Sequence, residues 1–201
     1  MRLLAFDTST DWISVAVSDG DEWHLHAERV AQDNSRRILP IISRTLAEAG
    51  FTLQALDGIA FGAGPGAFTG VRIACGIAQG LAFAIDRPVV GVSTLEALAH
   101  EAFRVHGAKR VVACLDARMR EIYAACYVRE QDEWRVADQR SLHAFLSALI
   151  ASSRTRFHSS STLSTNGLAR KMSLSFLSKR VSTVALMRPG RADITTTRSA
   201  R

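Results

Sequence analysis

A stretch rich in glycine and proline, GAGPGAFTG at residues 62–70, has the composition of a loop that something else approaches closely. Gly-rich loops that lead into a helix present backbone N–H groups, which can bind the oxygens of a phosphate. Gly64, Gly66 and Thr69 would line such a cradle. No Gly-Lys-Ser/Thr follows, so the segment is not a P-loop. The alternative, which we favour, is a tight turn that lets a strand and the following helix pack closely.

Two further polar turns could contribute charged groups. Asp7, Thr8 and Ser9 follow the first apolar run, and Asp7 could hold a magnesium ion through water, although a structural turn is favoured. The second turn, DARMRE, carries Asp116 and Arg118 and could contact a nucleotide or a protein partner. Its other interpretation is a solvated hairpin with an exposed Arg–carboxylate pair, worth only about 0–1 kcal/mol.

Residues that could catalyse a reaction or bind a metal do not occur at the spacings of the known motifs. The segment HEAFR begins like the zinc motif HExxH, but Arg104 stands where the second histidine must be. His24 and His26 share one face of a predicted strand, with no third ligand evident beside them. The sequence therefore predicts no metal site, no catalytic residue and no protease activity.

The helix predicted at residues 71–85 has almost no polar face, since Arg72 and Gln79 are its only polar residues. Its other residues form ladders at i,i+4 spacing. The small ladders are Ala74, Ala78, Ala82 and Gly76, Gly80, Ala84, and the bulky ladder is Ile73, Ile77, Leu81, Ile85. We expect the bulky side to pack on its own sheet and a small side to admit another helix. From the residues alone, that helix belongs equally well to the same subunit or to a second one.

The first 106 residues predict one α/β unit that begins with an antiparallel meander. The predicted strands lie at residues 2–6, 12–18, 23–31, 56–62 and 88–92, the last two buried. One helix runs from N-caps at residues 33–35 to Gly50, and another from Ser93 or Thr94 to about Val105. Pro40 lies inside the former, so we expect a bend or a late start there.

A second lobe is expected to start at residue 107 and to reach residue 150. Strands are predicted at 110–115, 122–128 and 134–136, and a helix at 142–150. This order repeats the start of the first unit, which suggests two related lobes.

Residues 151–201 form a basic tail rich in Ser, Thr and Arg. They hold ten of the 25 Lys and Arg residues and one of the 19 Asp and Glu, so the net charge of +6 belongs to this tail. The remaining 15 basic and 18 acidic residues give the first 150 residues a net charge of −3, which does not suggest nucleic-acid binding. The tail could be an RNA-binding arm, a disordered linker, or a segment read in the wrong frame beyond Ile150. We favour the wrong frame, because the second lobe stops where it needs more strands.

The expected location is the cytoplasm. Cys75, Cys114 and Cys126 lie in apolar stretches without ligand spacing, which fits a reducing compartment. The chain reaches Asp7 too soon for the apolar region of a signal peptide. Its longest apolar run is shorter than the roughly 20 residues of a membrane span, so no membrane partner is expected.

Five segments, in order and at compact spacing, closely resemble the TsaB (YeaZ) family. They are LLAFDTSTDWISVAV, ILPIISRTLAEAG, LDGIAFGAGPGAFTGVRIACGIAQGLAF, PVVGVSTLEALAHEA and LDARMREIYAACY. The resemblance covers roughly residues 1–130, and the tail resembles nothing in the family. It implies an α/β, actin-like or Hsp70-like fold of two RNase H-like lobes. The first lobe would hold a mixed five-stranded sheet with helices, and the second would be incomplete.

The resemblance also implies a role. TsaB proteins are non-catalytic partners of the related subunit TsaD, which transfers threonylcarbamoyl to adenosine 37 of tRNAs that read codons starting with A. The implied partners are thus a TsaD-like subunit, a TsaE-like ATPase and a second copy of the chain, with tRNA reached only through the complex. No cofactor of its own is implied, although ATP or ADP and magnesium could bind in the complex.

Family likeness assigns the partner interface to the apolar helix and the helix before it. The residues are Arg36, Leu39, Ile42, Leu46, Arg72, Ala74, Gly76, Ala78, Gly80, Phe83 and Ala84. Actin-like ATPases carry an Asp-Gly-Thr turn in the first hairpin, whereas Thr8 replaces the Gly here and would hinder a phosphate. Two other functions are weighed: a small-molecule kinase or carbamoyl-transfer enzyme of the same fold, and an RNA-binding protein that uses the basic tail.

Overall fold

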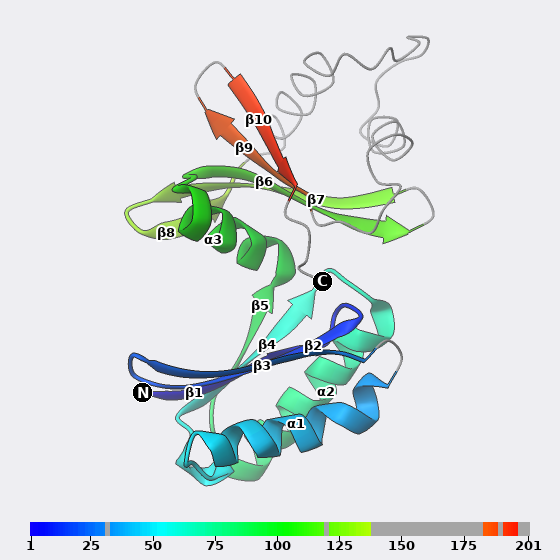
Figure 1. The fold of residues 1–201 in the computed structure, drawn as a ribbon, viewed down its shortest axis with the longest axis vertical. Helices are drawn as coiled ribbons and strands as arrows, with labels where there is room; N and C mark the ends of the chain where they lie inside the picture. Colours follow the sequence, from blue (N-terminus) through cyan, green and yellow to red (C-terminus); the bar gives the residue numbers. More distant parts are fainter. Residues whose placement is uncertain (31–32, 119–120, 138–182, 189–190, 197–201) are drawn as a thin grey trace. The chain divides into compact units, whose positions relative to one another are not determined.

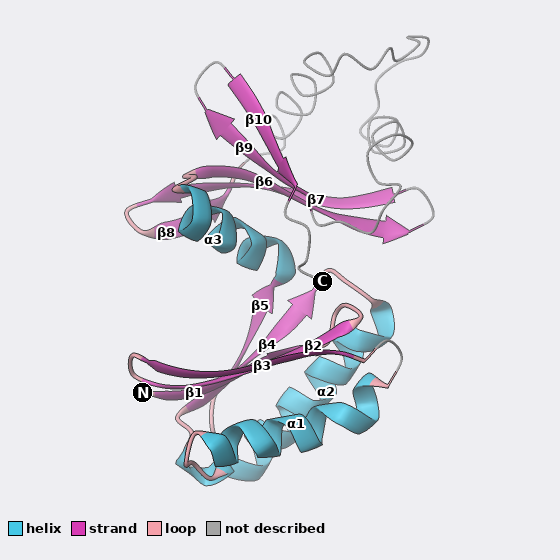
Figure 2. Ribbon diagram, in the orientation of Figure 1, coloured by secondary structure: helices cyan, strands magenta, loops and turns pink. Residues whose placement is uncertain are grey.

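The computed structural model describes residues 1–30, 33–118, 121–137, 183–188 and 191–196. The chain divides into two compact units, Met1–Thr94 and Leu95–Arg201, each with its own sheet (Figure 1). The first unit combines its strands with two α-helices, and among the described residues of the second unit one α-helix precedes the strands (Figure 2).

The first unit holds a mixed five-stranded sheet of order β3-β2-β1-β4-β5. The strands are β1 (Arg2–Asp7), β2 (Trp12–Asp19), β3 (Glu22–Arg29), β4 (Gly58–Gly64) and β5 (Val89–Ser93). The first three form the predicted antiparallel meander, while β4 runs parallel to β1 and β5 parallel to β4. The sequence therefore predicted this sheet correctly in its strands and in its meander.

Two helices, α1 (Asn34–Glu48) and α2 (Phe68–Ile85), cover one face of this sheet (Figure 1). The short 3-10 helix η1 (Leu53–Ala55) precedes β4. Side chains of the two helices and the sheet share one core, in which Leu4, Ile13, Ile38 and Ile59 are almost fully buried. The alternation of apolar residues along β1 and β2 places one side of each strand in this core.

The start of α1 differs from the expectation. The helix begins at Asn34 and continues through Pro40, so it does not start late, and the alternative of a bend at Pro40 stays a prediction. Asp33 occupies the N-cap position without a side-chain hydrogen bond. Asn34 is no cap either, because its amide nitrogen donates to the carbonyl oxygen of Thr8 at 3.3 Å.

The strand predicted at residues 88–92 is confirmed as β5, but its predicted burial is wrong. Val89, Val90 and Val92 are all exposed, and the exposed fraction of Val90 is 58%. Strand β5 lies at the edge of the sheet, so it has a strand neighbour on one side only. A short apolar run of this kind predicts a strand, but it does not show whether the strand lies in the centre or at the edge of the sheet.

In the second unit, α3 (Thr94–His106) packs on the second sheet. Leu95, Ala99 and Ala102 of the helix share a core with Val111 and Tyr127 of the strands. This buried side of the helix explains why the boundary between the units lies at residue 94, and not at residue 106 as expected from the sequence.

The second sheet also has five strands, in the order β10-β9-β6-β7-β8. They are β6 (Arg110–Arg118), β7 (Glu121–Glu130), β8 (Glu133–Val136), β9 (Thr183–Arg188) and β10 (Arg191–Thr196). Two strands of the tail, β9 and β10, belong to this sheet, and the expectation of an incomplete second lobe stays a prediction. However, β9 runs antiparallel to β6, whereas β4, in the corresponding place of the first sheet, runs parallel to β1.

The predicted helix at 142–150 and most of the tail lie outside the described residues. The wrong-frame interpretation of residues 151–201 stays a prediction.

Candidate functional site

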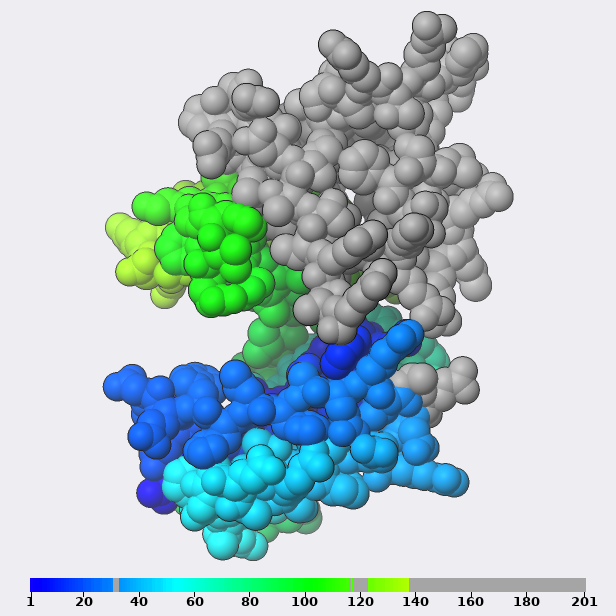
Figure 3. All heavy atoms as spheres, viewed as in Figure 1, coloured from blue at the N-terminus to red at the C-terminus, as the bar shows by residue number. Residues whose placement is uncertain are grey.

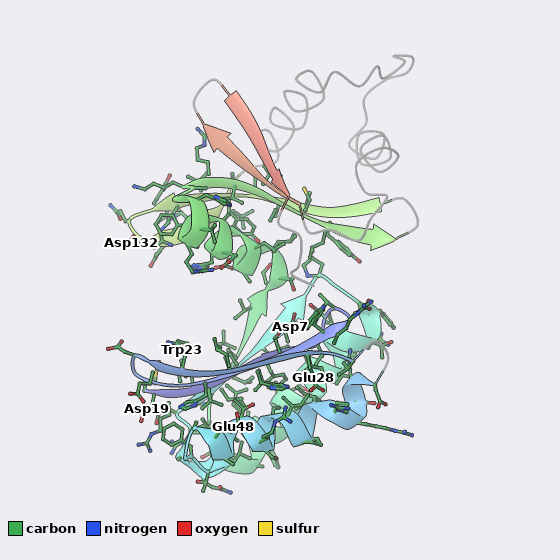
Figure 4. The ribbon with its side chains drawn as sticks, in the orientation of Figure 1. Asp7, Asp19, Trp23, Glu28, Glu48 and Asp132 are labelled. Atoms are coloured by element: carbon green, nitrogen blue, oxygen red, sulfur yellow. The ribbon has the colours of Figure 1, made fainter. Side chains whose placement is uncertain are left out.

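The polar turn after β1 is closed by hydrogen bonds within the chain. The carboxylate of Asp7 accepts from the backbone N–H and from the hydroxyl of Ser9, both at 2.9 Å. The buried Thr8 hydroxyl donates to the carbonyl oxygen of Gly70 at 2.7 Å, and Ala67 N–H donates to Ser9 O at 2.6 Å. Figure 4 shows Asp7 at the end of β1, beside the segment that joins β4 to α2.

Glycines of that segment leave room for the turn. A Cβ atom at Gly66 would lie 2.6 Å from Cβ of Ser9, and one at Gly70 would lie 1.9 Å from the carbonyl oxygen of Thr8. Neither distance is tolerable for a real side chain, so the glycines are required by close packing of two backbone segments. This geometry supports the interpretation of GAGPGAFTG as a tight turn.

The structure brings only some of the predicted phosphate-contact residues together. Those in the packed turn and loop are Asp7, Thr8, Ser9, Gly64 and Gly66. Thr69 is exposed in the first turn of α2. Asp116 and Arg118 belong to β6 of the second unit, and their side chains lie outside the description. Gly70, which lies just before the helix predicted at residues 71–85, is a buried residue of α2 and part of the packing contact.

Thr8→Val is expected to destabilise the first unit by about 1–3 kcal/mol, because it leaves the Gly70 carbonyl without its buried donor. Urea unfolding monitored by circular dichroism would measure this change. Thr10→Val is the matched control, since its hydroxyl bonds at the exposed start of β2. Equal stability of both variants would show that the Thr8–Gly70 bond does not anchor the turn.

The apolar helix α2 places its ladders differently from the expectation. Ala74, Ala78 and Ala82 are buried against the core of their own unit, so the predicted role of Ala74 and Ala78 in a partner interface is wrong. The bulky ladder packs half-buried beside them. The ladder of Gly76, Gly80 and Ala84 is exposed, as an interface requires.

One side of α2 lies open along its whole length. Its residues are Phe68, Arg72, Gly76, Gln79, Gly80 and Phe83, here called the open stripe. Phe83 is 92% exposed and Phe68 is 68% exposed, although both side chains are aromatic. Cβ atoms added at Gly76 and Gly80 would meet nothing within 4 Å. The described chain therefore gives no packing reason for these two glycines.

Helix α1 contributes a second open side beside this stripe. Arg36 and Leu39 are exposed there, as predicted for the interface, and the space-filling view shows α1 at the surface of the first unit (Figure 3). Ile42 and Leu46 were also assigned to the interface, and this is wrong, since they are 2% and 6% exposed in the core. Leu39 lies at the border of the buried side, since Leu46 follows it by about two helical turns.

The sequence analysis missed Phe68 as a member of this surface. Its ring lies four residues before Arg72, and the guanidinium carbon of Arg72 stacks 3.6 Å from the ring centroid. The i,i+4 spacing of an aromatic and a cationic residue was the signal that could have revealed the pair.

By length and composition alone, α2 could cross a membrane. It has 18 residues with a mean hydropathy of 1.5. Its alanine ladder, however, lies in a protein core that includes strands β1, β2 and β4. One side of the helix thus packs on its own sheet, and the other side is open.

The other charges near α1 are paired across to β3. Glu28 of β3 accepts from Arg37, and its carboxylate lies 3.2 Å from His26 Nε2 and 4.0 Å from Arg44 (Figure 4). Arg44 also approaches Glu48 at 3.9 Å. The hydrogen bond with His26, together with the charges of Arg37 and His26, lowers the pKa of Glu28 from its usual value. These pairs hold the edge strand against the helix.

No group of three or more His, Cys, Asp or Glu side chains that could hold a metal ion occurs among the residues that the structure describes. Cys114 is buried, which raises the pKa of its thiol to about 12 and makes it a poor nucleophile. The open stripe, with its exposed aromatic residues, has the character of a contact surface.

Comparison with known proteins agrees with the geometry. The family model described as TsaD, tRNA N6-adenosine threonylcarbamoyltransferase, matches residues 25–196. The tRNA threonylcarbamoyladenosine biosynthesis protein TsaB of Haemophilus influenzae is 49% identical over 132 residues, which cover 65% of this chain and 56% of the relative. TsaB of Escherichia coli is 46% identical over 132 residues, 66% of this chain and 57% of the relative. The match thus spans little more than half of either relative.

Among solved structures, YeaZ from Pseudomonas aeruginosa superimposes with a TM-score of 0.65 at 51% identity, and the match covers 69% of this chain and 65% of that one. Together with the strand order of the first unit, these matches define an actin-like protein with an RNase H-like sheet. Within the wider TsaD family, this chain belongs to the TsaB (YeaZ) family.

Proposed function

We propose that this chain is a non-catalytic partner of a TsaD-like subunit in the formation of threonylcarbamoyladenosine at position 37 of tRNAs that read codons starting with A. The observation that carries the proposal is the open stripe, in which Cβ atoms at Gly76 and Gly80 would meet nothing within 4 Å and both Phe68 and Phe83 are exposed. Exposed aromatic residues beside backbone that can be approached closely are typical of a protein interface. The relatives named TsaB supply the pathway.

An enzymatic role of the same fold, such as a small-molecule kinase or a carbamoyl-transfer enzyme, gains no support from the polar turn. Asp7 and Thr8 already bond to groups of their own chain, and the backbone of residues 66–70 packs on the turn. For a non-catalytic partner, the packing of residues 66–70 on the polar turn would only have to hold α2 in place. A TsaE-like ATPase, and ATP or ADP with magnesium, would then join at the level of the complex.

The direct test mixes the purified chain with the TsaD-like subunit of the same organism and measures mass by size exclusion with light scattering. We expect one heterodimer peak and a chain that shows no threonylcarbamoyl transfer by itself. The same measurement is made with the Gly80→Leu variant. Separate elution of the two wild-type proteins at micromolar concentration would contradict the proposal.

A further inference from the structure

Three charged or titratable side chains meet where the edge strand β3 lies against α1. His26 and Glu28 belong to β3, and Arg44 belongs to α1. The ring of His26 lies between the other two: Nε2 is 3.2 Å from a carboxylate oxygen of Glu28, and Nη2 of Arg44 is 3.1 Å from Nδ1 and 2.7 Å from Nε2. The side chains of His26 and Glu28 are 24% and 23% exposed, so water screens these contacts less than it screens a fully exposed pair.

The contact between His26 and Arg44 requires a neutral ring. A guanidinium group only donates hydrogen bonds, and a neutral imidazole has one accepting and one donating nitrogen. When the proton lies on Nε2, this nitrogen donates to Glu28 while Nδ1 accepts from Arg44, so both partners are satisfied. A protonated imidazole has two donors and no acceptor. Protonation therefore breaks the hydrogen bond to Arg44, and it places two cations side by side.

The strands around the ring supply another group that titrates with it. His24 lies two residues earlier on the same side of β3. Val15, the residue of β2 in register with His26, carries no charge. A protonated His24 adds positive charge on this side of the strand, so it opposes the approach of Arg44 in the same sense as protonation of His26 does.

Helix α1 gives Arg44 an alternative partner. A carboxylate oxygen of Glu48 lies 3.9 Å from Nε of Arg44, one helical turn further along α1. Arg37, also on α1, donates to the other carboxylate oxygen of Glu28 and holds that carboxylate in place. A guanidinium group released by His26 can therefore pair with Glu48 without leaving the surface of the helix.

Glu28 keeps its charge over the pH range in which an imidazole titrates. The hydrogen bond with His26, together with the charges of Arg37 and His26, lowers the pKa of Glu28 from its usual value. A carboxyl group with a lowered pKa stabilises the fold above its unfolded pKa, near 4.5, and this contribution is lost only as the pH falls through the lower, folded pKa. Histidine is the side chain that changes its charge between about pH 5 and 8. Glu28, Arg37 and Arg44 are therefore charged throughout this range.

We propose that His26 is a pH-sensitive switch that joins β3 to α1 at high pH and releases Arg44 at low pH. The neutral ring connects Arg44 to Glu28. On acidification a proton binds the ring nitrogen that accepted from Arg44, the hydrogen bond from Nη2 breaks, and Arg44 pairs with Glu48 while the ring and Glu28 form an ion pair. Because β3 lies at the edge of the sheet, the helix then loses one of its attachments to that edge. The switch does not depend on the proposed function.

The test is a double-mutant cycle between His26 and Arg44 in the full chain. The wild type, His26→Ala, Arg44→Ala and the double variant are unfolded with urea at about pH 8 and at about pH 5.5, on either side of the titration of an imidazole. At the higher pH we expect the pair to raise the folding equilibrium constant by a coupling factor of roughly two to five. At the lower pH the factor should be one or less, since like charges repel. The remaining histidines occur in all four proteins, so their titration cancels.

Two controls use the same cluster of side chains. Arg37 and Glu28 keep their charges over this range, so the coupling factor in their own cycle should be equal at both pH values. His26→Gln keeps a side chain that can accept from Arg44 and donate to Glu28, but this side chain does not titrate. Its coupling with Arg44 should therefore persist at about pH 5.5.

Equal coupling of His26 and Arg44 at both pH values would overturn the proposal, and so would a coupling factor of one at about pH 8. A change of the same size in the cycle of Arg37 and Glu28 would also overturn it, because the pH dependence would then belong to the charge of the whole chain. If the coupling of Arg44 with His26→Gln were lost at low pH as well, protonation of His26 would not be the cause.

Discussion

Gly80→Leu is expected to raise the Kd for a TsaD-like subunit by roughly one to two orders of magnitude while the chain stays folded. The added side chain meets open space in its own unit, since a Cβ atom at Gly80 has nothing within 4 Å. Leucine is also the better helix former by roughly 0.5–1 kcal/mol, so the melting temperature should not fall. Only a partner that packs against the glycine is disturbed, and overpacking of a close contact costs about 1–3 kcal/mol. Titration calorimetry measures the change in Kd.

The control for this variant is Ala97→Leu, which adds a leucine at an exposed position of α3 in the second unit. Its affinity for the subunit should equal that of the wild type. If Gly80→Leu bound as tightly as Ala97→Leu, the open stripe of α2 would not be the contact surface.

Gly70→Ala is expected to destabilise the first unit by at least about 2 kcal/mol. The new Cβ atom would lie 1.9 Å from the carbonyl oxygen and 2.9 Å from the carbonyl carbon of Thr8. These are backbone atoms, so the helix and the turn must move apart, and the Thr8–Gly70 hydrogen bond is strained or lost. The midpoint of urea unfolding measures the loss.

The matched variant is Gly76→Ala, which makes the same chemical change in the same helix. Because a Cβ atom there meets nothing within 4 Å, it should stabilise the isolated chain by roughly 0.5–1 kcal/mol. Opposite signs for the two variants are the expected outcome. Stabilisation by both would mean that the turn and α2 do not pack as closely as described.

The strands of the first sheet could be predicted because one side of β1 and β2 is apolar and the turns between them are short. The exposure of β5 could not be predicted, because the apolar sequence VVGV is compatible with a central strand and with an edge strand. The position of α3 was another difference. The helical spacing of its apolar residues indicates one buried side, but it does not show which of the two sheets this side packs on.

The candidate interface was predicted only in part, for a similar reason. Helix α2 is apolar almost all round, so the rotation of the helix decides which ladder is buried, and that rotation is a property of the packed unit. The bond between Thr8 and Gly70, absent from any local pattern, fixes the start of the helix. For α1, Leu46 follows Leu39 by about two helical turns, so the helical period alone could not show that Leu39 is exposed and Leu46 is buried.

The contact between Thr8 and Gly70 joins residues that are 62 positions apart. Such a contact closes a long loop, and it forms only when the first hairpin and the start of α2 have both left the ribosome. An isolated peptide of residues 68–85 would lack this anchor, and an isolated helix of that length is marginal in water. The open stripe is thus acquired only with the assembled first unit. A partner that binds this stripe would therefore stabilise the folded first unit over the unfolded chain.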